Sequence, residues 1–481
     1  MKLPLHLAAA FVSKQSADSP TLHRHLPSFI PQQRALFGTS ALNMKSNAAA
    51  QAEGTVIVGG GIAGLAVAAA LRNVAGVSDV KLLEASSKAA FQSTESGAAA
   101  QLGPNGLRAL NFISSSSDNN DDEDMVQKVL GMGGTLEGNV MMMPGGQTMA
   151  IPDTTKADTE IPQVLVRWGM LRKLLAEQLP EDVVITDAGK EIAGYQSGSG
   201  DNADHVTIID ASGNTIDNLS STPLIIGADG VNSAFRALVR EDVQHLTTDI
   251  SEVSSADVKY GGRINVKAVV DKSLGGEYKS GHTHAAFAPD GSVAVFAGPA
   301  GEDSTYWAIS VADSVSDETT VTFTDGLSLG SDGTIVKEDL KEKLLTKLNS
   351  LDSDPYIQTV IDLIKDTSAD KIYCQKSEEA KELGNHPLHS ADGRIVLAGD
   401  AAHAMSASYG QAANFALEDA ATLAACIRDG DDLVGALKDY SEKRLDRCIE
   451  MQTRSAERAA KAMKGEQVED VSKWIFQWEI A

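Results

Sequence analysis

The residues best suited to chemistry lie in a glycine-rich turn near the start of the chain. A G-x-G-x-x-G pattern spans residues 59–64, directly after the β-branched run 55–58 and before the alanine-rich stretch 65–71. Glycines at this spacing permit a tight turn, a close approach of the backbone to a pyrophosphate and close packing of a helix on a strand. The start of that helix also presents free N–H groups to phosphate. We therefore predict that a dinucleotide binds along the turn, at Gly59, Gly61, Ile62, Ala63 and Gly64.

An acidic residue follows at the distance that this kind of site requires. Glu84 lies 20 residues beyond Gly64, at the end of a second predicted strand over 79–83. A carboxylate at that place accepts hydrogen bonds from the ribose hydroxyls of an adenine dinucleotide. It would repel a ribose 2′-phosphate, so we expect this site to reject NADP. The strand, turn, helix and second strand together form a βαβ unit.

Two later strands also end in residues that could contact such a ligand. The apolar run 224–226 leads into Gly-Ala-Asp-Gly at 227–230, and the run 395–397 leads through Ala398 into Gly399 and Asp400. An aspartate at a strand end can hold a ribityl or ribose hydroxyl, and helix N-terminal amides can stabilise negative charge on a bound ring. On its own, the segment 227–230 is more simply an Asp-Gly turn.

In this order and at these separations, the three segments resemble the single-component (class A) flavoprotein monooxygenases of the para-hydroxybenzoate hydroxylase type. The resemblance covers roughly residues 54–460 and extends to the segment 101–110, to an Arg-x-x-x-Leu helix that begins at Arg167, and to a closing helix over 440–447. It implies an α/β fold with a Rossmann-like FAD-binding domain, an interleaved β-sheet substrate domain and C-terminal helices.

The resemblance also implies a role for each candidate residue at the ADP end of the cofactor. The glycines of 59–64 and Glu84 would hold the ADP half of FAD, and Arg167 would contact the FAD from a neighbouring helix. Asp229 and Gly230 lie in a segment that serves both FAD and the reduced nicotinamide in this family.

Three further residues are expected at the other end of the cofactor. Asp400 would bind the ribityl chain and the pyrophosphate side, and the amides near Gly410 and Asn414 would face the edge of the isoalloxazine. We nominate no catalytic residue, because the cofactor carries the chemistry and the protein supplies orientation and electrostatics. The strands of residues 257–325 are expected to roof a pocket that excludes water from the flavin.

The implied activity is an FAD-dependent monooxygenase that uses NAD(P)H and O2 to hydroxylate or epoxidise a hydrophobic aromatic or isoprenoid small molecule. The chain has no second nicotinamide-binding motif, so NAD(P)H is expected to dock transiently. Two departures keep a second interpretation open, because Ala407 stands where the family usually has proline and Ala412 where it has glycine. They favour an FAD-binding reductase-type or catalytically degenerate flavoprotein. Alanine at 412 would resist backbone angles that glycine adopts, so it should hold the flavin rigidly and slow its reduction.

Composition and charge exclude several classes of function. The formal net charge of −25 argues against a nucleic-acid partner, which needs clustered lysine and arginine. No stretch approaches the roughly 18 apolar residues of a transmembrane helix, although peripheral membrane contact stays open. No metal site is predicted, because the three cysteines lie far apart and His282 and His284 share a strand face without a third ligand.

The N-terminal segment differs from the rest of the chain. Residues 1–50 contain five basic residues and one acidic residue and are rich in serine, alanine and proline, which is typical of an organellar transit peptide. The segment Ala8–Phe11 resembles the cleavage site of a bipartite plastid leader, so we expect an organellar location, with plastid preferred to mitochondrion. The predicted organisation is a targeting segment at 1–50, a first FAD-binding part at 51–255 with a disordered insert at 114–124, a substrate-domain sheet with helices at 256–385, a closing FAD-binding part at 386–430 and C-terminal helices at 431–481.

Overall fold

The computed structural model describes one compact unit of the chain. It covers residues 46–480 apart from gaps at 96, 116–123, 143–147, 153–154, 199–203, 217–218, 220, 242, 245–256, 275–277, 279, 289, 316–319, 331–333, 352–354, 382, 385 and 465–469. The first 45 residues, which include most of the predicted targeting segment, lie outside the described residues. No helix in the described part combines the length and the apolar character needed to cross a bilayer.

A parallel sheet forms the first of two cores. Its five strands run in the order β19 (Ile395–Leu397), β11 (Ile225–Gly227), β1 (Thr55–Val58), β2 (Val80–Glu84) and β8 (Val184–Thr186). All four residues of β1 are buried, as expected for a short β-branched run between two parallel neighbours. Helix α2 (Ile62–Asn73) follows β1 and packs against α13 (Ala412–Asp429), which in turn packs against α14 (Leu433–Lys464).

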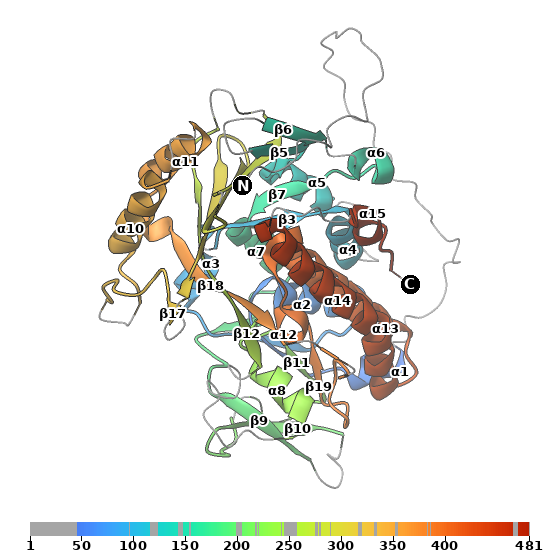
Figure 1. The fold of residues 1–481 in the computed structure, drawn as a ribbon. Helices are drawn as coiled ribbons and strands as arrows, with labels where there is room; N and C mark the ends of the chain where they lie inside the picture. Colours follow the sequence, from blue (N-terminus) through green and yellow to red (C-terminus); the bar gives the residue numbers. More distant parts are fainter. Residues whose placement is uncertain are drawn as a thin grey trace. The chain divides into compact units, whose positions relative to one another are not determined.

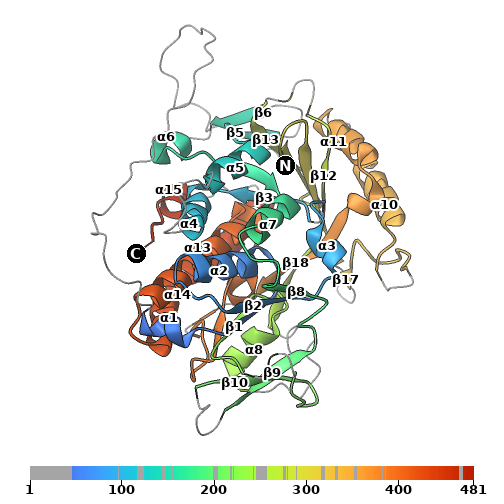
Figure 2. The same cartoon turned by 180° about the vertical axis from the view of Figure 1, so that it is seen from behind.

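A seven-stranded sheet forms the second core. Its order is β18 (Tyr373–Ala380), β12 (Val258–Val270), β15 (Thr305–Ala312), β14 (Val293–Pro299), β13 (His282–Phe287), β5 (Gly138–Met142) and β6 (Thr148–Pro152). Figures 1 and 2 show α10 (Lys337–Asn349) and α11 (Pro355–Asp366) along one face of this sheet, on the outside of the unit. Leu340, Leu344 and Trp307 are fully buried between these helices and the sheet.

We call the opposite face of this sheet the inner face, defined by the residues of β12, β14 and β15 that alternate with the core positions. On β15, Thr305, Trp307, Ile309 and Val311 are buried, while the residues between them are half-buried. This period of two is that of a strand with two different environments. The inner face adjoins the strand that contains Leu165, because a Cβ on Gly298 of β14 would lie 3.3 Å from the Leu165 side chain.

Smaller elements connect the two cores. A three-stranded sheet has the order β3 (Ala99–Leu102), β7 (Val164–Arg167) and β4 (Gly134–Thr135), and two hairpins pair β9 (Ile192–Ser197) with β10 (Val206–Asp210) and β16 (Ser314–Val315) with β17 (Thr320–Val321). The remaining helices are α1 (Asn47–Gln51), α3 (Lys88–Gln92), α4 (Pro104–Ser114), α5 (Met125–Met132), α6 (Thr155–Thr159), α7 (Trp168–Ala176), α8 (Ala234–Glu241), α12 (Asp400–His403) and α15 (Ser472–Phe476). Two short 3-10 helices are η3 (Ala369–Lys371) and η4 (Ala407–Tyr409).

The structure corrects two of the predicted boundaries. Strands β5 and β6 belong to the seven-stranded sheet, although the sequence placed residues 51–255 in the FAD-binding part. Helix α1 belongs to the fold, although it falls mostly within the 1–50 segment: Ala48 and Ala49 are fully buried, and α1 contacts α13 and α14. Most of the predicted insert at 114–124 lies outside the described residues.

Candidate functional site

The glycine turn is shaped by close contacts that no larger residue could make. Gly59 has a φ of 111°, and a Cβ there would lie 2.2 Å from the carbonyl oxygen of Ala228. A Cβ on Gly64 would lie 1.9 Å from the carbonyl oxygen of Gly59, so this glycine lets α2 pack on the turn. A Cβ on Gly61 would meet nothing within 4 Å, so this side of the turn faces open space. Gly59 and Gly64 thus permit the tight turn and the close helix packing that the sequence predicted, and their contact with a dinucleotide stays a prediction.

Glu84 closes the turn from the end of β2. Its Oε2 accepts a hydrogen bond from the amide of Gly60 at 2.8 Å, and its Oε1 accepts one from the amide of Ser86 at 2.7 Å. Ile62 and Ala63 form the first turn of α2, whose N-cap is Gly61 and which no side chain caps. The N–H groups at this helix end therefore remain for an anion in front of them.

Asp229 starts a helix rather than pointing into the turn. Its Oδ1 accepts a hydrogen bond from the hydroxyl of Ser233 at 2.6 Å, and its Oδ2 accepts one from the amide of Ala234 at 2.9 Å, at the beginning of α8. Burial raises the pKa of Asp229 above its ordinary value. Both carboxylate oxygens therefore bind the start of α8, and the expected place of Asp229 in a segment that serves FAD and the reduced nicotinamide stays a prediction. Gly230, with a φ of 86°, lies beside it in open space.

Asp400 stands at the end of β19, next to the glycine turn. A Cβ on Gly399 would lie 2.6 Å from the Cβ of Ala63, so the Gly-Asp turn packs directly on α2. The buried guanidinium of Arg236 donates to the backbone oxygens of Asp400 and Ala401, at 3.2 and 3.1 Å. Among residues 46–480, no hydrogen bond is described to the carboxylate of Asp400 itself. Burial raises its pKa, and the neighbouring charges of His403, Lys267 and Arg236 act in the opposite direction.

The Asn414 side chain holds two backbone segments together. Its Oδ1 accepts a hydrogen bond from the amide of Gly103 at 2.8 Å, and its Nδ2 donates to the carbonyl oxygens of Gln101 and Gly410, at 2.8 and 3.0 Å. The Asn414 side chain is fully buried and holds these segments in place. Gly410 has a left-handed φ of 64° and ends η4. It directs the chain into α13. The expected contact between the amides near Gly410 and Asn414 and the edge of the isoalloxazine remains a prediction.

Comparisons with known proteins agree on one family. The family described as "FAD binding domain" matches residues 352–455, and the one described as "NAD(P)-binding Rossmann-like domain" matches residues 57–118. The chain is 24% identical to the aurachin C monooxygenase/isomerase of Stigmatella aurantiaca, over 82% of this chain and 85% of the relative. It is 26% identical to an FAD-dependent urate hydroxylase of Mycolicibacterium vanbaalenii, over 84% and 87%. A crystal structure of Klebsiella pneumoniae HpxO with FAD and uric acid has the same fold, with a TM-score of 0.64, 20% identity and coverage of 88% of this chain and 92% of that one.

The chain is similar to the class A FAD-dependent monooxygenases. It is an FAD-dependent oxidoreductase, and FAD is its cofactor. The glycine turn fits the cofactor in three respects: α2 has no side-chain cap, Gly61 faces open space, and Glu84 holds the turn from the second strand. The start of α2 would hold the pyrophosphate, and Glu84 would hold the adenosine ribose.

Arg167 pairs with acidic side chains in this structure. It is the last residue of β7 and the N-cap of α7, and its guanidinium forms ion pairs with Glu95, at 3.2 Å, and with Asp271. Lys371 pairs with the same two acids, so the four side chains form one charged group between the two cores. The expected contact of Arg167 with FAD stays a prediction.

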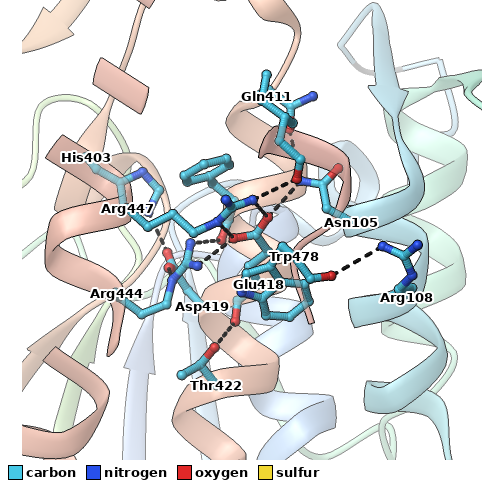
Figure 3. A network of polar contacts seen from close by, with 12 residues as sticks. Asn105, Arg108, His403, Gln411, Glu418, Asp419, Thr422, Arg444, Arg447 and Trp478 are labelled. Carbon is cyan, nitrogen blue, oxygen red and sulfur yellow. Dashed lines mark hydrogen bonds and ion pairs between the residues drawn. The ribbon is translucent and has the colours of Figure 1, made fainter. Parts of the chain in front are cut away.

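The sequence did not reveal the buried ion network in this monooxygenase (Figure 3). Glu418 and Asp419 on α13 are fully buried and face Arg444 and Arg447 on α14. Arg447 donates to both carboxylate oxygens of Glu418 at 2.8 Å, and Arg444 Nε donates to Asp419 at 2.7 Å. The sequence did contain a signal for this network. Arg444 and Arg447 lie on the same helix face as the buried residues Tyr440, Cys448 and Met451. Arginines on the packed face of a helix indicate buried acidic partners.

This network reaches the residues around the flavin-binding loop. Asn105 on α4 donates to Glu418 Oε1 at 2.7 Å and to Gln411 Oε1 at 3.0 Å. Arg447 also donates to the carbonyl oxygens of Trp474 and Ile475, and Arg108 to those of Phe476 and Trp478. The C-terminal helix α15 and the loop before α13 are therefore held by one connected set of polar contacts.

His403 belongs to the same network and not to a metal centre. His403, Asp419 and Cys448 place three potential ligand atoms within 4.8 Å of one another. However, the Asp419 carboxylate already accepts hydrogen bonds from His403 at 2.6 Å, from the amide of Gly399 at 2.8 Å and from Arg444. A guanidinium beside the carboxylate repels a second cation. The cluster instead locks α12 onto α13, as the structural role expected for His403 requires.

Proposed function

We propose that this monooxygenase uses NAD(P)H and O2 to hydroxylate or epoxidise a hydrophobic aromatic or isoprenoid small molecule. The observation that carries the proposal is the inner face of the seven-stranded sheet. Half-buried Phe296 and Tyr306 lie there with ring centroids 5.8 Å apart, and Ala308 lies opposite Phe296 on the adjacent strand. An apolar surface with aromatic rings suits a flat or elongated hydrophobic molecule.

The inner face adjoins the flavin-binding elements. Leu165 on β7 lies 3.3 Å from the place of a Cβ on Gly298, at one end of the face. Helix α12, which begins at Asp400, contacts β18 at the edge of the sheet. A molecule on the inner face would thus lie between the two cores, shielded from bulk water. That shielding is what an oxygenating flavoenzyme needs to avoid side reactions.

The protein's part in the proposed reaction is to bind, orient and exclude water. When bound, FAD accepts a hydride from NAD(P)H and delivers electrons to O2. The start of α2 and Glu84 fix the ADP half, while Asp400 and the start of α13 are positioned for the other half. The positive end of the α13 dipole favours negative charge on a ring placed before it.

The two departures from the family pattern do not favour the degenerate alternative. Ala412 is the first residue of α13, after Gln411 with a φ of −97° and a ψ of −9°. Alanine is favoured in a helix. The backbone at this position therefore does not support the expectation that Ala412 holds the flavin rigidly and slows its reduction. Ala407 opens η4 after Ser406, which is extended with a ψ of 137°. The backbone there keeps a conformation that proline would also adopt.

The proposal is tested by following oxygen into a product. The FAD-loaded protein is incubated with NADH or NADPH, ¹⁸O₂ and a panel of phenols, quinone precursors and xanthophylls, and products are analysed by mass spectrometry. Substrate-stimulated oxidation of the nicotinamide with one ¹⁸O atom in the product is expected. Oxidation that yields only hydrogen peroxide with every compound would refute monooxygenation. Phe296→Ala should reduce turnover at equal FAD content, whereas Phe112→Ala, on α4 beside Arg428, should not.

We further propose that residues 1–45 direct the protein to an organelle, with plastid preferred to mitochondrion. The basic, serine-rich composition supports this address, and the segment precedes the first residue of the described fold. Fusion of residues 1–45 to a fluorescent protein tests the idea in cells that contain both organelles. Diffuse fluorescence throughout the cytosol would contradict it.

A further inference from the structure

The loop that leads into α13 is attached along its length to one side of α14. The loop comprises residues 404–410, between the end of α12 and the start of α13, and it contains η4. Three residues of α14 contact it: Gln452, Ser455 and Arg458. Residues three apart on a helix are neighbours on its surface, so these three lie on the same side of α14. We call these interactions the α14 contacts.

Two of the α14 contacts are hydrogen bonds to the backbone. At the start of the loop, Gln452 Nε2 donates to the carbonyl oxygen of Ala404 at 3.1 Å. Further along, the Ser408 hydroxyl donates to the carbonyl oxygen of Ser455 at 2.7 Å. Gln452 and Ser455 are both buried, so water competes little for these bonds. The two bonds hold the loop at both of its ends relative to α14.

The third α14 contact is a cation–π interaction. The guanidinium of Arg458 lies over the ring of Tyr409, 4.2 Å from the ring centroid. Tyr409 is half-buried against the first core, whereas Arg458 is exposed. An arginine within about 6 Å of an aromatic face is attracted to it. Because Tyr409 directly precedes Gly410, this contact restrains the chain at the point where it turns into α13.

Ala407 lies in the same loop, at the position where the family pattern has proline. Its side chain is exposed, and its carbonyl oxygen accepts a hydrogen bond from the amide of Gly410 at 3.0 Å. Within the part of the chain that the structure describes, no hydrogen bond is given by the amide of Ala407, so a proline there would break none. Proline fixes φ and reduces the number of conformations of an open loop. With alanine at this position, the restraint must come from elsewhere.

We propose that the α14 contacts take over the restraint of the missing proline, and that Gln452 and Arg458 are positioning residues for the flavin-facing loop. The proposal rests on FAD as the cofactor and on the expected place of the flavin edge before α13, and it does not depend on the reaction that follows. The start of α13 favours negative charge on a ring placed before it. A loop that leaves its place should therefore make the bound flavin harder to reduce.

The first test measures amide hydrogen exchange of residues 404–411 in the FAD-loaded protein. Arg458→Met should raise the exchange rate of this segment about 2- to 5-fold, which is the range expected for the loss of an exposed cation–π contact. Arg458→Lys keeps a cation and should preserve most of the protection. Ala407→Pro, added to Arg458→Met, should return exchange to near the wild-type rate, because a compatible proline stabilises a loop by a similar amount.

The second test measures the reduction potential of the bound FAD by equilibration with a redox dye. Arg458→Met combined with Ser408→Ala removes two of the α14 contacts and should lower the potential by about 10–30 mV. For a two-electron couple, this shift corresponds to a roughly 2- to 10-fold weaker hold on the reduced form. Adding Ala407→Pro should reverse most of the shift. A purely structural role of the contacts would leave the potential unchanged.

Controls on the same part of the protein separate the possible outcomes. Lys461, on α14, pairs with Glu457 at 4.0 Å, and Lys461→Met should alter neither measurement. Asp470→Asn removes a carboxylate that also interacts with the charge of Arg458, and it should leave the loop unchanged. Unchanged exchange in Arg458→Met, no recovery with Ala407→Pro, or faster exchange at an unchanged potential would each overturn the proposal. If both shifts occur while no ¹⁸O appears in any product, monooxygenation is refuted and the positioning role stands.

Discussion

Replacing Glu418 with glutamine should cost about 3–5 kcal/mol of unfolding free energy, because breaking a buried ion pair leaves an uncompensated charge. Glu418 is fully buried, and both of its carboxylate oxygens accept hydrogen bonds from Arg447. In the variant, the guanidinium groups of Arg444 and Arg447 would share one remaining carboxylate, that of Asp419. The new amide would also place its N–H groups against these donors.

Thermal unfolding, followed by circular dichroism and by flavin release, measures this effect. A loss of 3–5 kcal/mol corresponds to a decrease in Tm of about 3–6 °C, because an unfolding entropy of about 2.1 cal/mol/K per residue gives about 0.9 kcal/mol/K for a unit of this size. FAD affinity should fall as well, because Asn105 links Glu418 to Gln411 at the start of α13. The two signals should change together if the network supports the flavin-binding loop.

The control is the same substitution at the surface of α14. Glu442 pairs with Lys438 at 3.8 Å, and both side chains are largely exposed. Exposed pairs of this spacing contribute about 0.3–0.5 kcal/mol, so Glu442→Gln should leave Tm almost unchanged. A similar, small effect of both substitutions would refute the reasoning, since it would show that the buried charges of α13 and α14 contribute no more than a surface pair.

Four further predictions follow from other parts of the fold. Glu84→Ala should weaken FAD binding by about 1–3 kcal/mol, because two backbone amides lose their acceptor; titration of the apoprotein with FAD measures this. A chain starting at Ala52 should unfold at a lower temperature than one starting at Ser46, because it lacks the buried residues of α1; unchanged melting would place α1 outside the cooperative unit. Burial alone would lower the pKa of His403, but the facing carboxylate raises it well above 6.5, so stability should fall as pH rises from 6.5 through that folded-state pKa; urea unfolding should show this slope in the wild type and not in His403→Gln. Ala412→Gly should lower stability by up to about 1 kcal/mol without faster flavin reduction, and a faster reduction in stopped-flow measurements would restore the rigid-flavin hypothesis.

The sequence predicted the parts of the site that depend on local geometry. The glycine turn and Glu84 lie within one βαβ unit, whose spacing fixes how the chain can fold. A helix begins and a strand ends where the patterns of apolar residues and glycines place them. The contact between Glu84 and the amide of Gly60 follows directly from that local arrangement.

The sequence could not indicate partners that lie far along the chain. Asn414 binds the backbone 311 residues away at Gly103, and Arg167 pairs with Asp271, which is 104 residues away. A family pattern gives the position of such residues but not the carboxylates or carbonyls that compete for them. The same limit applies to β5, whose pairing with β13 no local pattern of residues could indicate.

The position of β19 has a consequence for how the protein is made. The glycine turn between β1 and α2 is synthesised early, whereas β19, which covers the edge of β11, is added only after residue 394. The last helix, α15, places Phe476 against Gly103 at the start of α4, where a Cβ would lie 2.6 Å from the ring. A growing chain on the ribosome therefore exposes the unpaired edge of β11 while residues 228–394 are synthesised, which is a site for misassociation. The last segments to be synthesised thus complete both the parallel sheet and the packing around Gly103.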